Sequence, residues 1–121
     1  MGTVGGDLRL GGEVDVAFTS GWTGPGRVDV CDRPHRLLLT MAPGTPEHTV
    51  IEATLTPVAE GTLLVVEERG LPTGVLPSHG AGWQVHIEDL AAHLAVRAAL
   101  AWRPRWQERV PAFEQELDRG A

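Results

Sequence analysis

Three histidines recur every seven residues in the C-terminal half of the chain: His79, His86 and His93. On a helix this spacing places them along one stripe, with successive members ~10.5 Å apart at 1.5 Å of rise per residue. Because metal–ligand bonds are only ~2 Å long, one ion cannot bridge two of them, and the sequence predicts no metal site. Two interpretations of these histidines stay open. In the first, all three are packing residues at the edge of an apolar face. In the second, His79 or His86 is a polar acid–base group at the mouth of a cavity.

Glu68 is the second residue with a potential chemical role. Strand alternation places Leu64, Val66 and Glu68 on one inward face, where an unpaired carboxylate is costly to bury. The carboxylate therefore anchors a polar group of a ligand, or acts as an acid–base group with a raised pKa. The alternative is a frayed strand end, at which Glu68 reaches solvent or pairs with Arg69 or Arg27.

Other chemical motifs are missing from the sequence. Ser20 and Ser78 lie outside any nucleophile-elbow context. The glycines do not form a GxGxxG pattern that opens a helix, so no phosphate-binding loop is predicted. Cys31 is the only cysteine, and nothing beside it favours a thiolate, so we interpret it as a packing residue. We expect no cofactor.

Composition narrows the classes of partner. The chain has 10 basic and 16 acidic residues and a formal net charge of −6, which argues against nucleic acid because that function needs clustered Lys and Arg. A length of 121 residues, with 42% hydrophobic and 21% charged residues, is typical of one globular domain. No apolar stretch approaches the ~18 residues that span a membrane, and no signal peptide is visible. We therefore expect a cytoplasmic protein that does not bind membranes.

The elements that carry these residues change type near Ser78. From residue 7 to about 71 the hydrophobic pattern has period two and is broken by turn residues, which predicts an antiparallel series of short strands. From His79 the period becomes 3.6, with Ser78 as a suitable N-cap. We expect at least five strands and then a helix over about 79–100.

The expected long helix carries an apolar stripe centred on Trp83. At ~100° per residue, four further apolar residues fall within about 40° of it, namely Ile87, Leu90, Leu94 and Ala101. We therefore expect Trp83 to be buried against the sheet. Pro104 should end or kink this helix, and a second amphipathic helix is predicted over 105–119, interrupted by Pro111.

Five local patterns occur in an order that resembles a known superfamily. They are Val4-Gly5-Gly6-Asp7-Leu8-Arg9; Gly26-Arg27-Val28 followed by Pro34 and Leu37-Leu38-Leu39-Thr40; Leu55-Thr56-Pro57 with Glu60-Gly61-Thr62; Glu68-Arg69-Gly70-Leu71; and His79 and Gly82-Trp83 with Leu90-Ala91-Ala92-His93-Leu94. Together, over about residues 4–96, they resemble the SRPBCC or START-like helix-grip superfamily, in particular its branch of heat-shock ATPase-activator homologues and polyketide cyclases.

The resemblance implies an α+β fold and a binding cavity. In the helix-grip fold a curved antiparallel sheet, here of about five to six strands, packs on a long C-terminal helix and leaves an apolar cavity; we expect a short C-terminal helix in addition. By position, the implied ligand-binding residues are Leu39, Met41, Ala53, Leu55, Val66, Glu68, His79, Trp83 and His86. Each apolar member can equally be plain core, because core and cavity-lining residues look alike in sequence.

Three functions follow from the resemblance. The first is a small hydrophobic ligand-binding protein with no assured catalysis. The second is a polyketide cyclase/dehydratase-like enzyme in which Glu68 and His79 or His86 act as acid–base groups. The third is a regulator of a partner protein, similar to the heat-shock ATPase activators. The superfamily hosts both binding and catalysis, so the fold alone does not choose between them.

The chain differs from the family pattern at its start. Family members usually have another strand and two short helices before the Gly-Gly segment at which this chain begins. We expect a START-like domain over 1–102 and a helical tail over 103–121. An unpaired sheet edge is a template for association, so we predict a homodimer formed through that edge or through an exchanged tail around Trp102, Trp106 and Phe113. The alternative is that the tail packs on its own sheet.

Overall fold

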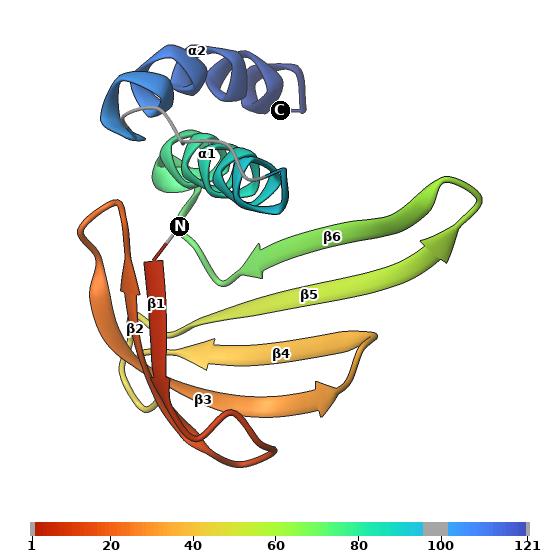
Figure 1. Ribbon diagram of the computed structural model, residues 1–121. Helices are drawn as coiled ribbons and strands as arrows, with labels where there is room; N and C mark the ends of the chain where they lie inside the picture. The colour runs from red at the N-terminus through yellow and green to blue at the C-terminus, as the bar shows by residue number, and fades with distance from the viewer. Residues whose placement is uncertain (1, 96–101, 121) are drawn as a thin grey trace. The chain divides into compact units, whose positions relative to one another are not determined.

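The computed structural model describes residues 2–95 and 102–120, which form six strands followed by helices (Figure 1). The strands are β1 Gly2–Gly6, β2 Glu13–Phe18, β3 Thr23–Asp32, β4 Arg36–Met41, β5 Thr49–Val58 and β6 Gly61–Arg69. They are followed by a short 3-10 helix η1 Thr73–Val75, then α1 Leu76–Leu94 and α2 Trp102–Gly120. The six strands form one sheet in the order β1-β2-β3-β4-β5-β6, with antiparallel pairing from β2 to β6. The predicted α+β class is confirmed.

The chain divides into two compact units. The sheet unit comprises Gly2–Ala17 and Thr23–Leu71, and the helical unit comprises Phe18–Trp22 and Pro72–Ala121. The connection between β2 and β3 therefore belongs with the helices, although the strands on either side of it belong to the sheet. Each unit is described below by itself.

The predicted inward-facing side chains share one face of the sheet. Residues directly opposite each other on neighbouring strands project from the same side. The opposed sets across β4, β5 and β6 are Leu37, Ala53 and Val66; Leu39, Ile51 and Glu68; and, on β5 and β6, Leu55 and Leu64. We call this surface the apolar sheet face. It continues onto β3 through Val28, which lies opposite Leu39 and is fully buried. The predicted alternation is confirmed for β4 to β6.

A β-bulge in β3 interrupts the alternation. The register shifts so that Val28 lies opposite Leu39 whereas Val30 lies opposite Leu38. Since Leu38 and Leu39 project from opposite faces, Val28 and Val30 do so as well. The residue between them is Asp29. The alternation of apolar and polar residues in the sequence would place Val28 and Val30 on the same face. A bulge inserts one residue without changing that alternation, so the sequence pattern does not predict it.

The opposite side of the sheet, which we call the charged sheet face, carries a ladder of ion pairs. Arg36 of β4 donates to Glu52 of β5 at 2.5 Å, and Arg69 of β6 donates to Glu52 at 3.1 Å and to Glu67 at 2.9 Å. The hydrogen bonds from Arg36 and Arg69 lower the pKa of Glu52 below its ordinary value. These side chains are partly to largely exposed, as expected for a solvated face.

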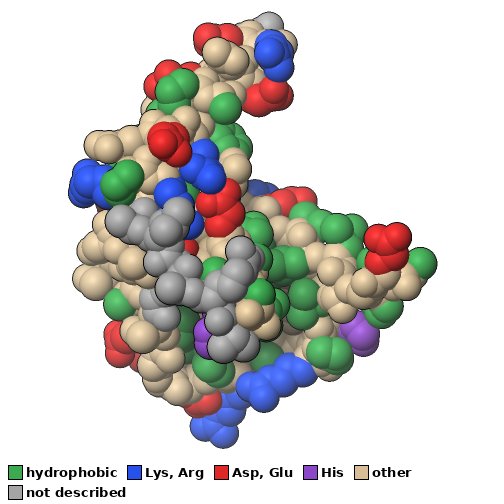
Figure 2. Space-filling view, turned by 45° about the horizontal axis from the view of Figure 1, so that its top comes forward, with side chains coloured by type: hydrophobic (Ala, Val, Ile, Leu, Met, Phe, Trp, Pro, Cys, Tyr) green, Lys and Arg blue, Asp and Glu red, His purple; other side chains and the backbone are tan. Residues whose placement is uncertain are grey.

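The β5–β6 hairpin exposes several apolar side chains. Leu55, Val58, Leu63 and Val65 are each between 37% and 52% exposed. Apolar side chains gather on the right of Figure 2, the side on which Figure 1 draws the β5–β6 turn. This hairpin therefore presents apolar surface on both of its sides.

The long helix begins earlier than the sequence predicts. α1 starts at Leu76, its N-cap is Val75, and Ser78 donates its hydroxyl to the Val75 carbonyl at 2.9 Å. Pro77 falls in the first turn, where a missing N–H costs nothing. The prediction of Ser78 as the N-cap is therefore wrong. The helix ends at Leu94, and the predicted continuation over 96–100 lies outside the described residues.

The second helix packs on the first, within the helical unit. α2 begins at Trp102, so Pro104 falls in its first turn and Pro111 lies inside it. The two helices approach closely at Gly80, where an added Cβ would lie 2.5 Å from Cδ1 of Phe113. The tail thus packs on α1 of its own chain.

The buried face of α1 differs from the predicted stripe. The buried residues are Pro77, Ala81, Gly82, Val85, His86, Asp89 and Ala92. Trp83 and Leu90 are half-buried, while Ile87 is 39% exposed and Leu94 is 73% exposed. Ala101 lies outside the described residues. Gly80 and Gly82 lie close to aromatic rings of α2, and a helical wheel built on large apolar residues gives glycines little weight.

Candidate functional site

The helical unit holds a continuous group of aromatic rings, which we call the aromatic cluster. Its members are Phe18, Trp22, Trp83, His86, Trp102 and Trp106. Phe18 is the last residue of β2 and Trp22 lies in the turn before β3, and the Phe18 N–H donates to the Trp22 carbonyl at 2.8 Å. Gly21 closes this turn with a positive φ of 101°, a conformation that glycine adopts without strain. The turn therefore presents both rings side by side.

The two helices supply the other four rings. Trp83 and His86 are three residues apart on α1, and Trp102 and Trp106 are four residues apart on α2. Both spacings place side chains on one side of a helix. Trp102 and Trp106 stack with a ring-centre distance of 5.7 Å and an interplanar angle of 18°.

His86 lies at the centre of the cluster. Its ring centre is 5.1 Å from Phe18, 5.8 Å from Trp83 and 5.4 Å from Trp102. These separations are in the range of favourable aromatic pairs. His86 is only 5% exposed. Burial lowers the pKa of its imidazole below 6.5, although the Asp89 carboxylate acts in the opposite direction. The imidazole is therefore neutral at pH 7.

Two polar atoms of the cluster are buried without a hydrogen-bond partner among the described residues: Nδ1 of His86 and Nε1 of Trp102. The neighbouring indole differs, because Nε1 of Trp106 donates to the Ser78 carbonyl at 2.8 Å. Buried polar atoms are almost always paired, so two on adjacent rings call for an explanation.

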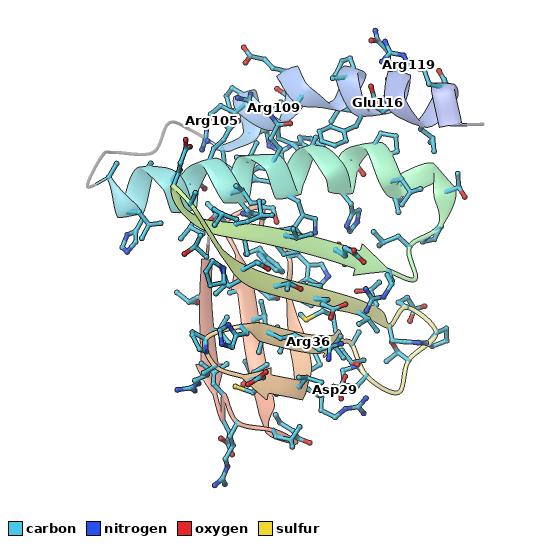
Figure 3. The ribbon with its side chains drawn as sticks, turned by 90° about the vertical axis from the view of Figure 1, so that its right-hand side faces the viewer. Asp29, Arg36, Arg105, Arg109, Glu116 and Arg119 are labelled. Atoms are coloured by element: carbon cyan, nitrogen blue, oxygen red, sulfur yellow. The ribbon has the colours of Figure 1, made fainter. Side chains whose placement is uncertain are left out.

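A network of ion pairs holds the two helices together beside the cluster. Arg105 contacts Asp89 at 2.6 Å and Glu88 at 3.4 Å, and Arg109 contacts Glu88 at 2.8 Å. Figure 3 shows Arg105 and Arg109 on the side of α2 that is turned towards α1. Burial alone would raise the pKa of Asp89, but the hydrogen bond from Arg105 helps to hold that pKa below its ordinary value. The network positions the first turns of α2, which carry Trp102 and Trp106.

In the sheet unit, Glu68 lies on the apolar sheet face and has a neutral partner. The Thr49 hydroxyl donates to its carboxylate at 2.9 Å. Thr49 lies opposite Met41 on β4, and Glu68 lies opposite Ile51 on β5. The half-buried carboxylate therefore lies next to apolar side chains of the sheet and accepts a hydrogen bond from Thr49. Sequence reasoning considered Arg69 or Arg27 as its partner and did not consider Thr49.

The predicted site residues are divided between the two units. Six lie on the apolar sheet face: Leu39, Met41, Ala53, Leu55, Val66 and Glu68. Ala53 and Val66 lie directly opposite each other, Met41 is buried, and Leu55 is 37% exposed. The other three are on α1, where Trp83 and His86 are in contact while His79 is exposed.

The sequence reasoning did not bring Phe18, Trp102 and Trp106 to this site. Phe18 was not among the predicted site residues, and the two tryptophans were assigned to the C-terminal tail. The spacing of Trp102 and Trp106 was an available signal, since two indoles four residues apart lie on one side of a helix. Within residues 2–95 and 102–120 no group of three His, Cys, Asp or Glu side chains is placed to hold a metal ion.

Comparisons with known proteins agree with this architecture. Residues 2–95 match the family model described as Activator of Hsp90 ATPase homolog 1-like protein. The crystal structure of CalU16 from Micromonospora echinospora is similar with a TM-score of 0.75 and 24% identity, covering 94% of this chain and 68% of that one. Its solution NMR structure gives a TM-score of 0.75 at 21% identity, covering 98% and 71%.

A third solved structure, protein MLL2253 from Mesorhizobium loti, has a TM-score of 0.52 at 21% identity and covers 98% of this chain and 76% of that one. At these identities the structures show a shared fold. A comparison with curated proteins gave no match. None of the helices in the described part of the chain is long and apolar enough to cross a membrane.

Proposed function

Because the chain belongs to the Activator of Hsp90 ATPase homolog 1-like protein family, within the SRPBCC superfamily, we propose that it binds a small hydrophobic molecule. The observation that carries this proposal is the apolar sheet face, on which Leu39, Ala53 and Val66 share one side with Glu68. An apolar surface with few polar groups is the usual make-up of a ligand site. The charged sheet face lacks this make-up.

The residues proposed to bind the ligand are those predicted from the sequence. On the sheet unit they are Leu39, Met41, Ala53, Leu55, Val66 and Glu68. On the helical unit they are His79, Trp83 and His86. The apolar members supply contact area, and the Glu68 carboxylate with its Thr49 partner supplies a polar end. The division into a START-like domain over 1–102 and a tail over 103–121 stays a prediction, as does a cytoplasmic location.

The test is a titration with a library of hydrophobic compounds, followed by the intrinsic fluorescence of the four tryptophans. Ala53→Phe fills space on the apolar sheet face and should weaken binding at least about 10-fold, or ~1.4 kcal/mol. The matched control is Thr54→Phe, the next residue along β5, which projects from the charged sheet face. Circular dichroism checks that both variants fold. A library without a binder contradicts the proposal, and so does equal weakening by the two substitutions.

A cyclase/dehydratase-like enzyme is the second candidate. The observation in its favour is the buried His86, whose lowered pKa leaves a neutral imidazole that can accept a proton near pH 7. Glu68 is the other acid–base candidate. Mass spectrometry of the bound compound after long incubation separates the two functions. An unchanged compound supports binding, whereas loss of water that is abolished by His86→Gln or Glu68→Gln supports an enzyme.

Regulation of a partner protein is the third candidate, and it rests on the description of the family. We also propose that the chain forms a homodimer, for which the exposed apolar side chains of the β5–β6 hairpin offer contact surface. Analytical ultracentrifugation over a wide concentration range tests the dimer. A single monomeric species at high micromolar concentration would contradict it.

A further inference from the structure

We propose that His86 and Trp102 form a polar anchor that binds one hydrogen-bond-accepting oxygen of a planar aromatic ligand. This inference rests on the proposed function, since it specifies the chemistry of a hydrophobic ligand. It starts from Nδ1 of His86 and Nε1 of Trp102, which are buried without a partner among the described residues. Their rings are adjacent, with centres 5.4 Å apart.

The two nitrogens determine which kind of ligand atom can form hydrogen bonds with both of them. An indole N–H donates and cannot accept, so the ligand atom facing Trp102 has to be an acceptor. A neutral imidazole nitrogen either donates or accepts, depending on the tautomer. A carbonyl oxygen can accept from both rings, and a hydroxyl oxygen can accept from Trp102 while donating to His86. An ammonium group has only donors and cannot satisfy Trp102.

The surroundings of the anchor favour a flat aromatic body for the ligand. Phe18 and Trp83 contact His86, and Trp106 stacks on Trp102. Aromatic rings pack favourably against other rings in stacked or edge-on arrangements. The ligand class that fits both features is therefore an aromatic alcohol or ketone rather than an aliphatic chain.

The anchor depends on a part of the chain outside the family match. The match ends at residue 95, and Trp102 opens α2. The position of Trp102 is fixed by contacts within the helical unit, since Arg105 and Arg109 of α2 pair with Glu88 and Asp89 of α1. The anchor therefore joins His86, inside the family match, to a residue of α2 that lies beyond it.

The stacked pair of indoles provides a matched control. Nε1 of Trp106 already donates to the Ser78 carbonyl, whereas Nε1 of Trp102 has no described partner. Trp102→Phe removes an N–H that is offered to the ligand. Trp106→Phe removes an N–H that is committed within the protein. Both substitutions keep an aromatic ring in the stack.

The experiment compares 2-naphthol with naphthalene, which differ by one hydroxyl group, as probes of the full chain. Isothermal titration should show that the wild-type protein binds 2-naphthol about 10-fold more tightly than naphthalene, the net worth of one buried hydrogen bond. Trp102→Phe should abolish this preference, and Trp106→Phe should retain it. Thermal unfolding confirms that both variants are folded.

A second measurement follows the indole N–H signals in a two-dimensional nitrogen–proton NMR spectrum, assigned by substitution of each of the four tryptophans. The Trp102 signal should move downfield with 2-naphthol and not with naphthalene. An unmoved Trp102 signal means that water alone satisfies the indole, and it overturns the anchor.

Equal affinity for the two probes also overturns the anchor but leaves hydrophobic ligand binding standing. Failure of both probes to bind overturns the anchor as well, and the library titration then decides the proposed function separately.

Discussion

Arg105 and Asp89 form a largely buried ion pair between α2 and α1. Their closest atoms, Nη2 and Oδ1, are 2.6 Å apart, and the side chains are only 12% and 7% exposed. The same guanidinium also contacts Glu88 at 3.4 Å. Such a pair is costly to break from one side, because the remaining buried charge loses its nearest opposite charge. It therefore fixes the first turn of α2 and with it Trp102.

We expect Arg105→Ala to lower the free energy of unfolding by about 3 kcal/mol, because it removes the guanidinium that pairs with the largely buried Asp89 carboxylate. Arg109→Ala is the matched control. Arg109 also pairs with α1, through Glu88, but the two side chains are 25% and 33% exposed, so its loss should cost less than about 1 kcal/mol. Urea unfolding measures both. Equal costs would show that burial does not distinguish the two pairs.

The close approach of the two helices at Gly80 gives a second prediction. Replacing a helical glycine by alanine ordinarily stabilises a helix by roughly 0.5–1 kcal/mol. At Gly80 the new Cβ would lie 2.5 Å from Phe113, and we expect a net destabilisation of about 1–3 kcal/mol from overpacking.

Gly82→Ala is the control for Gly80→Ala. The new Cβ at residue 82 would meet Trp102 at an ordinary 3.7 Å, so this substitution should stabilise the protein. Adding Phe113→Leu should recover part of the stability lost in Gly80→Ala, because it removes the ring that the methyl meets. Thermal unfolding measures the stability of the wild-type protein, Gly80→Ala, Gly82→Ala and the Gly80→Ala/Phe113→Leu double variant. The idea fails if both glycine substitutions change stability in the same direction.

The sheet was largely predictable because strand alternation is a local property. Ala53 and Val66 alternate with polar or exposed neighbours, and that pattern is enough to place them on one face. The bulge beside Asp29 was not predictable by alternation, since it depends on how β3 pairs with β4. The start of α1 was missed for a related reason. Ser78 resembles an N-cap in sequence, but its hydroxyl donates to the Val75 carbonyl inside the first turn.

The aromatic cluster was only partly predictable because its members are far apart in sequence. Trp83 and His86 were predicted as site residues from a helical pattern and a family resemblance. Phe18 and Trp102 join them from the end of β2 and from α2. No periodicity relates residues 18, 86 and 102, so only the packing of α2 on α1 and of the connection beside them reveals the cluster.

The pairing of Thr49 with Glu68 leads to a third prediction. Thr49→Val keeps the shape of the side chain but removes the hydroxyl that donates to the Glu68 carboxylate. We expect it to lower the free energy of unfolding by about 1 kcal/mol, the usual net value of one hydrogen bond. Thr54→Val on the charged sheet face is the control and should change stability by less than about 0.5 kcal/mol. Chemical denaturation that ranks the two variants in reverse order would contradict a stabilising role for this hydrogen bond.

The buried His86 predicts a loss of stability in mild acid. Burial lowers the pKa of His86 below 6.5 in the folded protein, while the Asp89 carboxylate, paired with Arg105, opposes that shift. Below pH 6.5 the unfolded chain therefore binds a proton at this residue more readily than the folded protein does. The contribution of His86 to stability is greatest above pH 6.5 and falls as the pH drops below that value.

Denaturant unfolding at a series of pH values between about 7 and 5 measures the decline. His86→Gln should make the decline shallower than it is in the wild-type protein. An unchanged slope in His86→Gln would mean that the imidazole is not held in the neutral form.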